Sequence, residues 1–173
     1  FCLYPHETLG IVGESGSGKS TIARAVTRLV KISEGEILLK GRDITHVKGK
    51  ALRDIYRSLQ MVFQSPAASF DPRRTLGDGI GERLRNCGMG KARRDEAAEK
   101  LLLSCGLPEE FAHRYPHEVS GGQCQRAAIA RALAVEPEIL ICDEATSALD
   151  VTVQAQVMEL LTRLRQQHRM SCL

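Results

Sequence analysis

The stretch that decides the fold is Gly13-Glu14-Ser15-Gly16-Ser17-Gly18-Lys19-Ser20-Thr21. It matches the phosphate-binding pattern G-x-x-x-x-G-K-[ST] at every fixed position. Glycines let successive backbone N–H groups turn toward phosphate oxygens, and the start of the following helix adds partial positive charge. We expect Lys19 to reach the outer phosphates and the Ser20 hydroxyl to contact a magnesium ion.

The flanking segments suit this loop. Residues 8–12 are predicted to form a short apolar strand, and the helix after the loop is predicted to turn Ile22, Ala25, Val26 and Leu29 inward. A Gly/Ser-rich turn sometimes matches the motif by chance. The order strand, glycine loop, helix favours a phosphate loop instead.

Composition limits the possible classes of protein. The 173 residues suffice for one domain with a subdomain, and the apolar fraction of 43% is ordinary for a globular chain. A net charge of +3 is too small to indicate nucleic acid or membrane binding by itself. No apolar run is long enough to span a bilayer, and no signal peptide is visible. The six cysteines lack zinc or C-x-x-C spacing and are interpreted as reduced thiols of a cytosolic protein.

Both ends of the sequence look interrupted. Residues 1–4 resemble the end of a strand, without a starting Met, and residues 170–173 resemble the opening of another. We therefore expect a piece of a longer chain.

The remaining sequence predicts an α/β fold in three parts. Strands are expected at 36–40, 61–63 and 139–142, and helices at about 50–59, 91–105, 120–134 and 151–167. Between residue 65 and about residue 135 no strand is expected, and Pro66, Pro72 and the glycines at 77, 79 and 81 predict an irregular or weakly helical start. We thus divide the chain into a nucleotide-binding core (1–64), an inserted helical subdomain (65–135) and the rest of the core (136–173), built on a parallel sheet.

Acidic and amide side chains follow two of these strands. Asp143 and Glu144 come directly after the apolar strand at 139–142, and Gln64 follows the strand at 61–63. A carboxylate at a strand's carboxyl end holds magnesium in phosphate-loop nucleotidases, which suits Asp143, and Glu144 is placed to polarise an attacking water. Many strands end in acids simply because that edge is solvated, and a polar loop residue is the alternative reading of Gln64. The phosphate loop upstream favours the functional reading.

A second anion site is expected at Ser120-Gly121-Gly122-Gln123. Ser120 and Gln123 have the spacing of a capping box. Two glycines in the first turn of a helix cost about 1 kcal/mol each relative to alanine. Close approach of an anion to the backbone explains them better than an ordinary cap does.

Together these motifs resemble an ABC-transporter ATPase over essentially the whole chain. Residues 13–21 correspond to its Walker A motif, Gln64 to the Q-loop, residues 120–123 to the signature, residues 143–144 to Walker B and residues 147–150 to the D-loop. The resemblance implies a P-loop NTPase (RecA-like) core whose inserted helical subdomain docks on a membrane partner.

The resemblance also implies how the site works. Two subunits would pair head to tail, with the signature of one closing over the ATP held by the Walker A motif of the other. That places Ser120, Gly121 and Gly122 on the γ-phosphate, with Gln123 and Asp150 also at the nucleotide. Glu144 would be the catalytic base, assisted by Gln64, and Ser20, Gln64 and Asp143 would surround Mg²⁺.

Within the superfamily, residues 4–18, 61–73 and 147–156 resemble the ATPases of bacterial peptide and nickel importers. That implies a peripheral subunit on the cytoplasmic side of the bacterial inner membrane. Its partners would be transmembrane permeases, a second ATPase that is identical or paralogous, and indirectly an extracytoplasmic solute-binding protein, with no nucleic acid. The solute is not identified.

Departures from the family pattern remove no catalytic group. Val119 replaces a usual Leu, and His6 replaces a usual glycine. The family's adenine-stacking aromatic and switch histidine fall outside the sequence. One alternative is therefore that these 173 residues alone do not hydrolyse ATP. The alternatives are a soluble ABC-type ATPase acting on nucleic acid or ribosomes, and an exporter ATPase.

Overall fold

A parallel sheet lies at the centre of the computed structural model, which describes residues 1–145 and 150–173. Its strand order is β3 (Leu59–Val62), β4 (Ile139–Cys142) and β5 (Ser171–Cys172). β3 pairs with β4 in a register that runs from Leu59 opposite Ile139 to Val62 opposite Cys142. The predicted parallel sheet is confirmed, with β3 beginning two residues earlier than expected.

The segment before the phosphate loop joins this sheet at one point only. Thr8 forms an isolated parallel bridge with Cys172, supported by a 2.9 Å hydrogen bond from the Leu9 N–H to the Cys172 carbonyl. The predicted strand over residues 8–12 is therefore wrong beyond Thr8. Residues 9–12 belong to no strand, and Val12 is 96% exposed.

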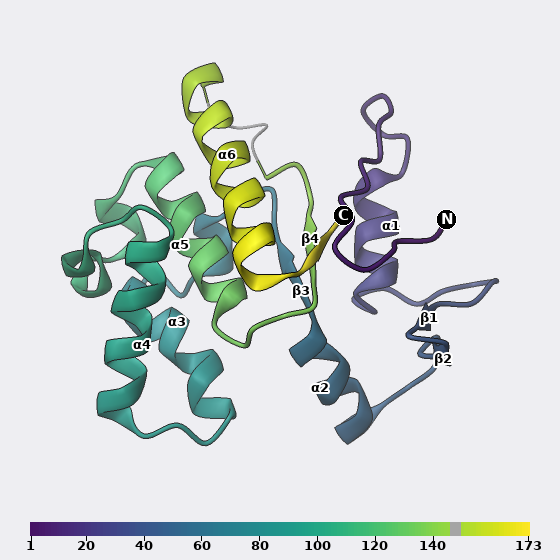
Figure 1. Ribbon diagram of the computed structural model, residues 1–173, viewed down its shortest axis with the longest axis horizontal. Helices are drawn as coiled ribbons and strands as arrows, with labels where there is room; N and C mark the ends of the chain where they lie inside the picture. Colours follow the sequence, from purple (N-terminus) through teal and green to yellow (C-terminus); the bar gives the residue numbers. More distant parts are fainter. Residues whose placement is uncertain (146–149) are drawn as a thin grey trace.

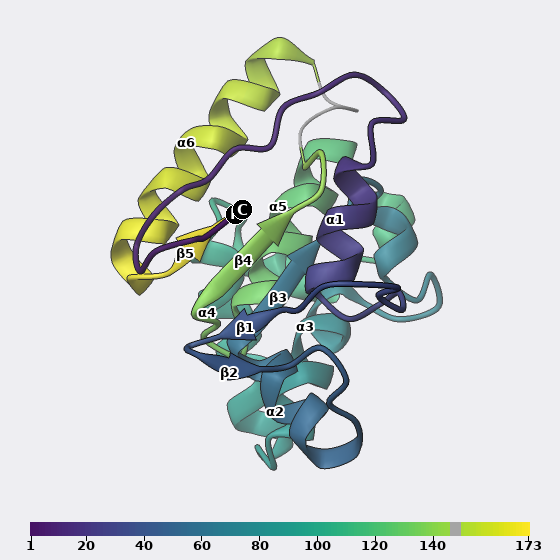
Figure 2. The ribbon, with the colours of Figure 1, turned by 90° about the vertical axis from the view of Figure 1, so that its right-hand side faces the viewer.

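Helices cover both faces of the sheet. α1 (Lys19–Val26) lies on one face, whereas α5 (Gly121–Leu133) lies on the opposite face (Figures 1 and 2). Side chains alternate between these faces along β3, since Met61 packs in a small cluster with Ala23 of α1, and Val62 packs in the main core with α5. The sheet therefore separates the phosphate loop from α5.

The inward face of α1 differs from the prediction. Ala23 and Thr27 are buried, while Ile22 and Leu29 are 37% and 51% exposed. The helix ends at Val26, so Leu29 lies beyond its last turn. The small side chain of Ala23 packs against the sheet, and the Thr27 hydroxyl donates a 2.9 Å bond to the Ala23 carbonyl.

A hairpin and a helix connect α1 to β3. The predicted strand at 36–40 is reduced to β1 (Leu38–Leu39), which pairs antiparallel with the unpredicted β2 (Arg42–Asp43). Lys40 and Gly41 between them have φ of 53° and 75°, as a type I′ turn requires. α2 (Gly49–Ser58) follows and confirms the helix expected at about 50–59.

The chain between β3 and β4 contains helices and no strand among its residues, as predicted. The α-helices are α3 (Leu76–Asn86), α4 (Lys91–Ser104) and α5. Short 3-10 helices occur at η1 (Ala67–Ser69), η2 (Glu109–His113) and η3 (Pro116–Glu118). Most of the main hydrophobic core is contributed by this region.

α3 is a regular helix, contrary to the irregular start that its glycines predicted. The Thr75 hydroxyl caps it by accepting from the Asp78 N–H. A Cβ on Gly77 would lie 2.7 Å from the Ala112 carbonyl oxygen, and a Cβ on Gly79 would lie 2.7 Å from the Phe70 ring. These glycines therefore permit close packing.

α6 (Val151–His168) completes the fold and confirms the predicted last helix. Its buried residues are Val157, Leu160, Leu161 and Leu164. The Asp150 carboxylate caps it by accepting a 3.0 Å bond from the Val153 N–H. Among the described residues, no helix has both the length and the apolarity needed to cross a bilayer.

Candidate functional site

The phosphate loop leads into the first turn of α1, where backbone N–H groups are available to bind an anion. Gly18, the residue before α1, has φ of 94°, a left-handed conformation that favours glycine. No described side chain caps α1, and the Ile22 N–H donates a 2.9 Å hydrogen bond to the Gly18 carbonyl. The preceding N–H groups of the first turn therefore lack partners within the helix and suit an anion.

Lys19 lies over this loop. Its Nζ donates to the carbonyl oxygens of Gly13 and Glu14 at 2.8 and 2.7 Å. The loop is tightened by a 3.2 Å bond from the Ser17 N–H to the Glu14 carbonyl. The ammonium group is thus held beside the backbone that the sequence predicts to surround phosphates. Ser15, Gly16 and Thr21 complete the loop at exposed positions.

Ser20 and Asp143 are brought into direct contact. The Ser20 Oγ donates a 2.7 Å hydrogen bond to Asp143 Oδ1. Asp143 is only 5% exposed, and its N–H donates to the Val62 carbonyl at the end of β3. The pairing of β3 with β4 therefore fixes a carboxylate beside the hydroxyl at the start of α1.

Gln64 and Glu144 form a second pair at the same edge of the sheet. The Gln64 Nε2 donates a 2.7 Å hydrogen bond to Glu144 Oε2. Glu144 has φ of 47°, a left-handed conformation that is uncommon outside glycine and is often found at functional sites. Glu144 follows β4 by two residues and is exposed.

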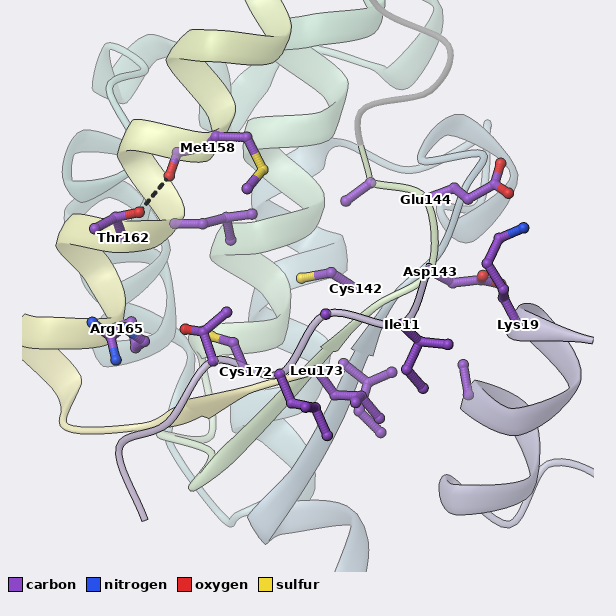
Figure 3. A pocket seen from close by; sticks show the side chains of 17 residues that line it. Ile11, Lys19, Cys142, Asp143, Glu144, Met158, Thr162, Arg165, Cys172 and Leu173 are labelled. Carbon is purple, nitrogen blue, oxygen red and sulfur yellow. Dashed lines mark hydrogen bonds between the residues drawn. The ribbon is translucent and has the colours of Figure 1, made fainter. Parts of the chain in front are cut away.

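A cavity of about 340 Å³ lies next to these groups. Figure 3 shows Lys19, Asp143 and Glu144 at one end, and Met158 and Thr162 of α6 on another wall. Ile11, Cys142, Cys172 and Leu173 contribute apolar lining. Burial raises the pKa of the Cys142 thiol to about 12, so it stays neutral behind the carboxylates.

Ser120 and Gln123 make the predicted capping box at the start of α5. The Ser120 N–H donates to Gln123 Oε1 at 2.9 Å, and the Gln123 N–H donates to Ser120 Oγ at 3.3 Å. Because α5 and α1 cover opposite faces of the sheet, this helix start belongs to a different face from the phosphate loop (Figures 1 and 2).

The starts of α5 and α6 lie against each other. A Cβ on Gly122 would come within 2.7 Å of Val153 Cγ1, so close helix packing already explains this glycine without an anion. Sequence patterns offered no sign of the contact, because Val153 is an ordinary apolar residue of α6. Asp150 caps α6 beside this contact, whereas residues 147–149 of the expected D-loop lie outside the described residues.

The family model described as ABC transporter matches residues 1–147. The chain belongs to the ABC transporter family.

Curated members of the ABC transporter family are similar along nearly the entire chain. The oligopeptide transport ATP-binding protein OppF of Salmonella typhimurium is 48% identical over 171 residues, covering 98% of this chain and 51% of OppF. The glutathione import ATP-binding protein GsiA of Salmonella paratyphi A is 51% identical over 170 residues, covering 96% of this chain and 27% of GsiA. The chain thus spans about half or less of the length of these relatives.

A solved ABC cassette has the same fold. The dimeric ATP-binding cassette MJ0796, in a post-hydrolysis state bound to ADP and Pi, matches with a TM-score of 0.89 and 32% identity. The match covers 99% of this chain and 75% of that one. The expected phosphate-loop nucleotidase fold is thereby confirmed.

Proposed function

We propose that this chain binds and hydrolyses ATP as the nucleotide-binding subunit of an ABC importer for a peptide or another small solute. The observation that carries the ATPase part is the placement of Lys19, Ser20, Gln64, Asp143 and Glu144 at one edge of the sheet. The import part is supported by similarity to the OppF and GsiA proteins.

The residues present fit Mg²⁺ as well as ATP. Mg²⁺ is usually held by one or two carboxylates together with substrate phosphates and water, rather than by a cage of protein ligands. In keeping with this, the described residues contain no cluster of three or more His, Cys, Asp or Glu that suits a metal. Ser20 and Asp143 would be the ligands from this chain, with Gln64 nearby. When bound, Mg²⁺ would neutralise charge developing on the phosphates.

Each residue at the site has a proposed task. The N–H groups of residues 13–21 bind the phosphates, and Lys19 leaves its loop carbonyls to contact the outer ones. Glu144 accepts a proton from the attacking water, and Gln64 orients the Glu144 carboxylate through their hydrogen bond. Positioning and charge stabilisation supply most of the acceleration in phosphoryl transfer.

A second ATPase subunit would complete the site. α1 and α5 lie on opposite faces of the sheet (Figure 2). The residues at the start of α5 are therefore suited to a nucleotide held by another subunit; they are Ser120, Gly121, Gly122 and Gln123. A two-fold, head-to-tail pair satisfies both helix starts at once. Asp150 would lie at the interface because it begins α6 beside Gly122.

The proposed setting is the cytoplasmic side of a bacterial inner membrane. Permease subunits would bind the helical subdomain, taken as residues 65–135 between the two parts of the core (1–64 and 136–173). A solute-binding protein would act through the permease. Nucleic acid is not among the proposed partners, and the relatives favour transport over action on nucleic acid or ribosomes.

The test is recovery of the tagged full-length protein from detergent-solubilised native membranes. We expect multi-spanning permease subunits and an ATPase partner to copurify with it, and the permease would point to the solute. Recovery of ribosomal or DNA-associated proteins, with nothing from the membrane fraction, would contradict the importer and leave the ATPase proposal standing.

A further inference from the structure

A polar pocket of about 300 Å³ lies in the helical region, apart from the phosphate loop. It is formed by the segment after η1, by α3 and by α5. Arg74, Arg83 and Arg131 line it, together with Asp71 and Glu82. None of these residues belongs to the proposed ATP site.

The acidic groups of this pocket are already engaged. Asp71 accepts from the Arg73 side chain at 3.2 Å, and that arginine lowers the pKa of the Asp71 carboxyl. Glu82 contacts Arg74 at 3.3 Å and Arg85 at 3.6 Å. Five arginines therefore surround two carboxylates, which leaves three positive charges without a compensating carboxylate in and around the pocket.

Arg131 is fixed in place although it lacks a carboxylate. Its guanidinium lies 4.7 Å from the centroid of the buried Phe70 ring and donates Nη1 to the Ser69 carbonyl. Burial, and after it the nearby charge of Arg83, lowers the pKa of Arg131 to about 10. The guanidinium still carries its charge at neutral pH and is held beside a like charge.

Arg83 is the free cation of this group. Within residues 1–145 and 150–173, its guanidinium has no ion pair or hydrogen bond. Arg83 lines the pocket and has no carboxylate partner among the described residues. An anion bound in the pocket would offset the electrostatic repulsion between Arg83 and Arg131.

We propose that this pocket binds a single carboxylate, presented by an aspartate or glutamate side chain of a partner protein. Planar guanidinium groups bind carboxylates and phosphates through paired N–H donors. One carboxylate placed between Arg83 and Arg131 would offset the repulsion between them, and inorganic phosphate is the competing anion with which the titration below compares it. The identity of the partner as a membrane permease rests on the proposed function, whereas the carboxylate site itself does not.

The chemistry is tested by titrating the full chain with acetate at neutral pH while following arginine side-chain N–H signals by NMR. We expect saturable shifts of the Arg83 and Arg131 signals, and about tenfold or more weaker binding in Arg83→Gln. Arg93→Gln, an exposed arginine on α4, serves as the matched control and should bind as the parent does. Absent shifts, equal binding by Arg83→Gln, or larger shifts with inorganic phosphate at the same concentration would overturn the site.

The source of the carboxylate is tested in the assembly. Arg83→Glu should lower the amount of chain retained with its membrane partners about tenfold relative to Arg93→Glu. Retention equal to that of the control would overturn the assignment to a partner's side chain. If the parent chain itself retains no membrane partner, the proposed function fails, and the acetate titration still decides the pocket.

Discussion

The Ser20 hydroxyl and the Asp143 carboxylate, 123 residues apart in the sequence, are joined by a 2.7 Å hydrogen bond. One belongs to the first turn of α1, and the other follows β4. This contact connects the two motifs that the proposed ATP site requires, and both residues are proposed ligands of one Mg²⁺.

Asp143→Asn should raise the Mg²⁺ concentration needed for half-maximal ATP turnover by about tenfold or more. Even residues that only hydrogen-bond the ligands of a metal change its affinity by about 10–100-fold, and this variant removes a charge from a proposed ligand itself. Asparagine keeps an oxygen that accepts from Ser20. Asp54→Asn, on the exposed side of α2, is the control, and a Mg²⁺ dependence equal to the parent's would remove Asp143 from the metal site.

Lys19→Ala should weaken ATP binding by about tenfold or more, because charge-assisted contacts to phosphate are lost. Titration with a fluorescent ATP analogue measures the effect. Lys31→Ala removes an exposed lysine from the chain just after α1 and should bind normally. Unchanged affinity in Lys19→Ala would contradict the proposed phosphate contact.

Gly77→Ala and Gly81→Ala should have opposite effects on stability, although both replace a glycine of α3. A Cβ at position 77 meets the Ala112 backbone oxygen at 2.7 Å, so we expect a loss of about 1–3 kcal/mol in the free energy of unfolding. At position 81 the nearest atom is 3.7 Å away, so alanine should gain up to about 1 kcal/mol. Urea denaturation of both variants measures this, and equal effects would show that Gly77 is not a packing residue.

The cysteines should differ sharply in reactivity. Burial raises the pKa of Cys105 and of Cys142 to about 12, whereas Cys2 and Cys87 are exposed. At pH 8 iodoacetamide should label Cys2 and Cys87 in the native protein and reach Cys105 only after unfolding. The raised pKa values of Cys105 and Cys142 also predict that the free energy of unfolding falls as pH rises from 9 toward 12. In that range the two thiols ionise in the unfolded chain before they ionise in the folded one. Rapid native labelling of Cys105 would contradict its burial.

Much of the architecture was predictable from sequence because local signals agreed with tertiary packing. β4 coincides with the apolar run at 139–142, and Ser120 caps α5 with the expected capping box. The positions of Asp143 and Gln64 after their strands follow from the parallel pairing of β3 and β4. Signals that span several residues and end in a defined cap are the reliable ones.

The predictions that were wrong concern features that depend on contacts with residues far away in the sequence. Apolar residues 8–12 read as a strand, but only Thr8 forms a bridge to the sheet. Ile22 follows the helical period, yet α1 turns Ala23 and Thr27 to the sheet. The glycines of α3 suggested weak helix formation because sequence does not reveal that Ala112 and Phe70 press against them. The pocket around Arg131 was not predicted for the same reason.

The most direct test of the central claim compares ATP turnover and dimer formation by the full-length protein and its Glu144→Gln variant, with Glu136→Gln as an exposed control. We predict that Glu144→Gln binds ATP with Mg²⁺, accumulates as a closed dimer measured by its mass in solution, and turns over ATP at least about 100-fold more slowly. Turnover by Glu144→Gln at the parent rate would contradict the assignment of Glu144 as the base and, with it, the proposed ATP site.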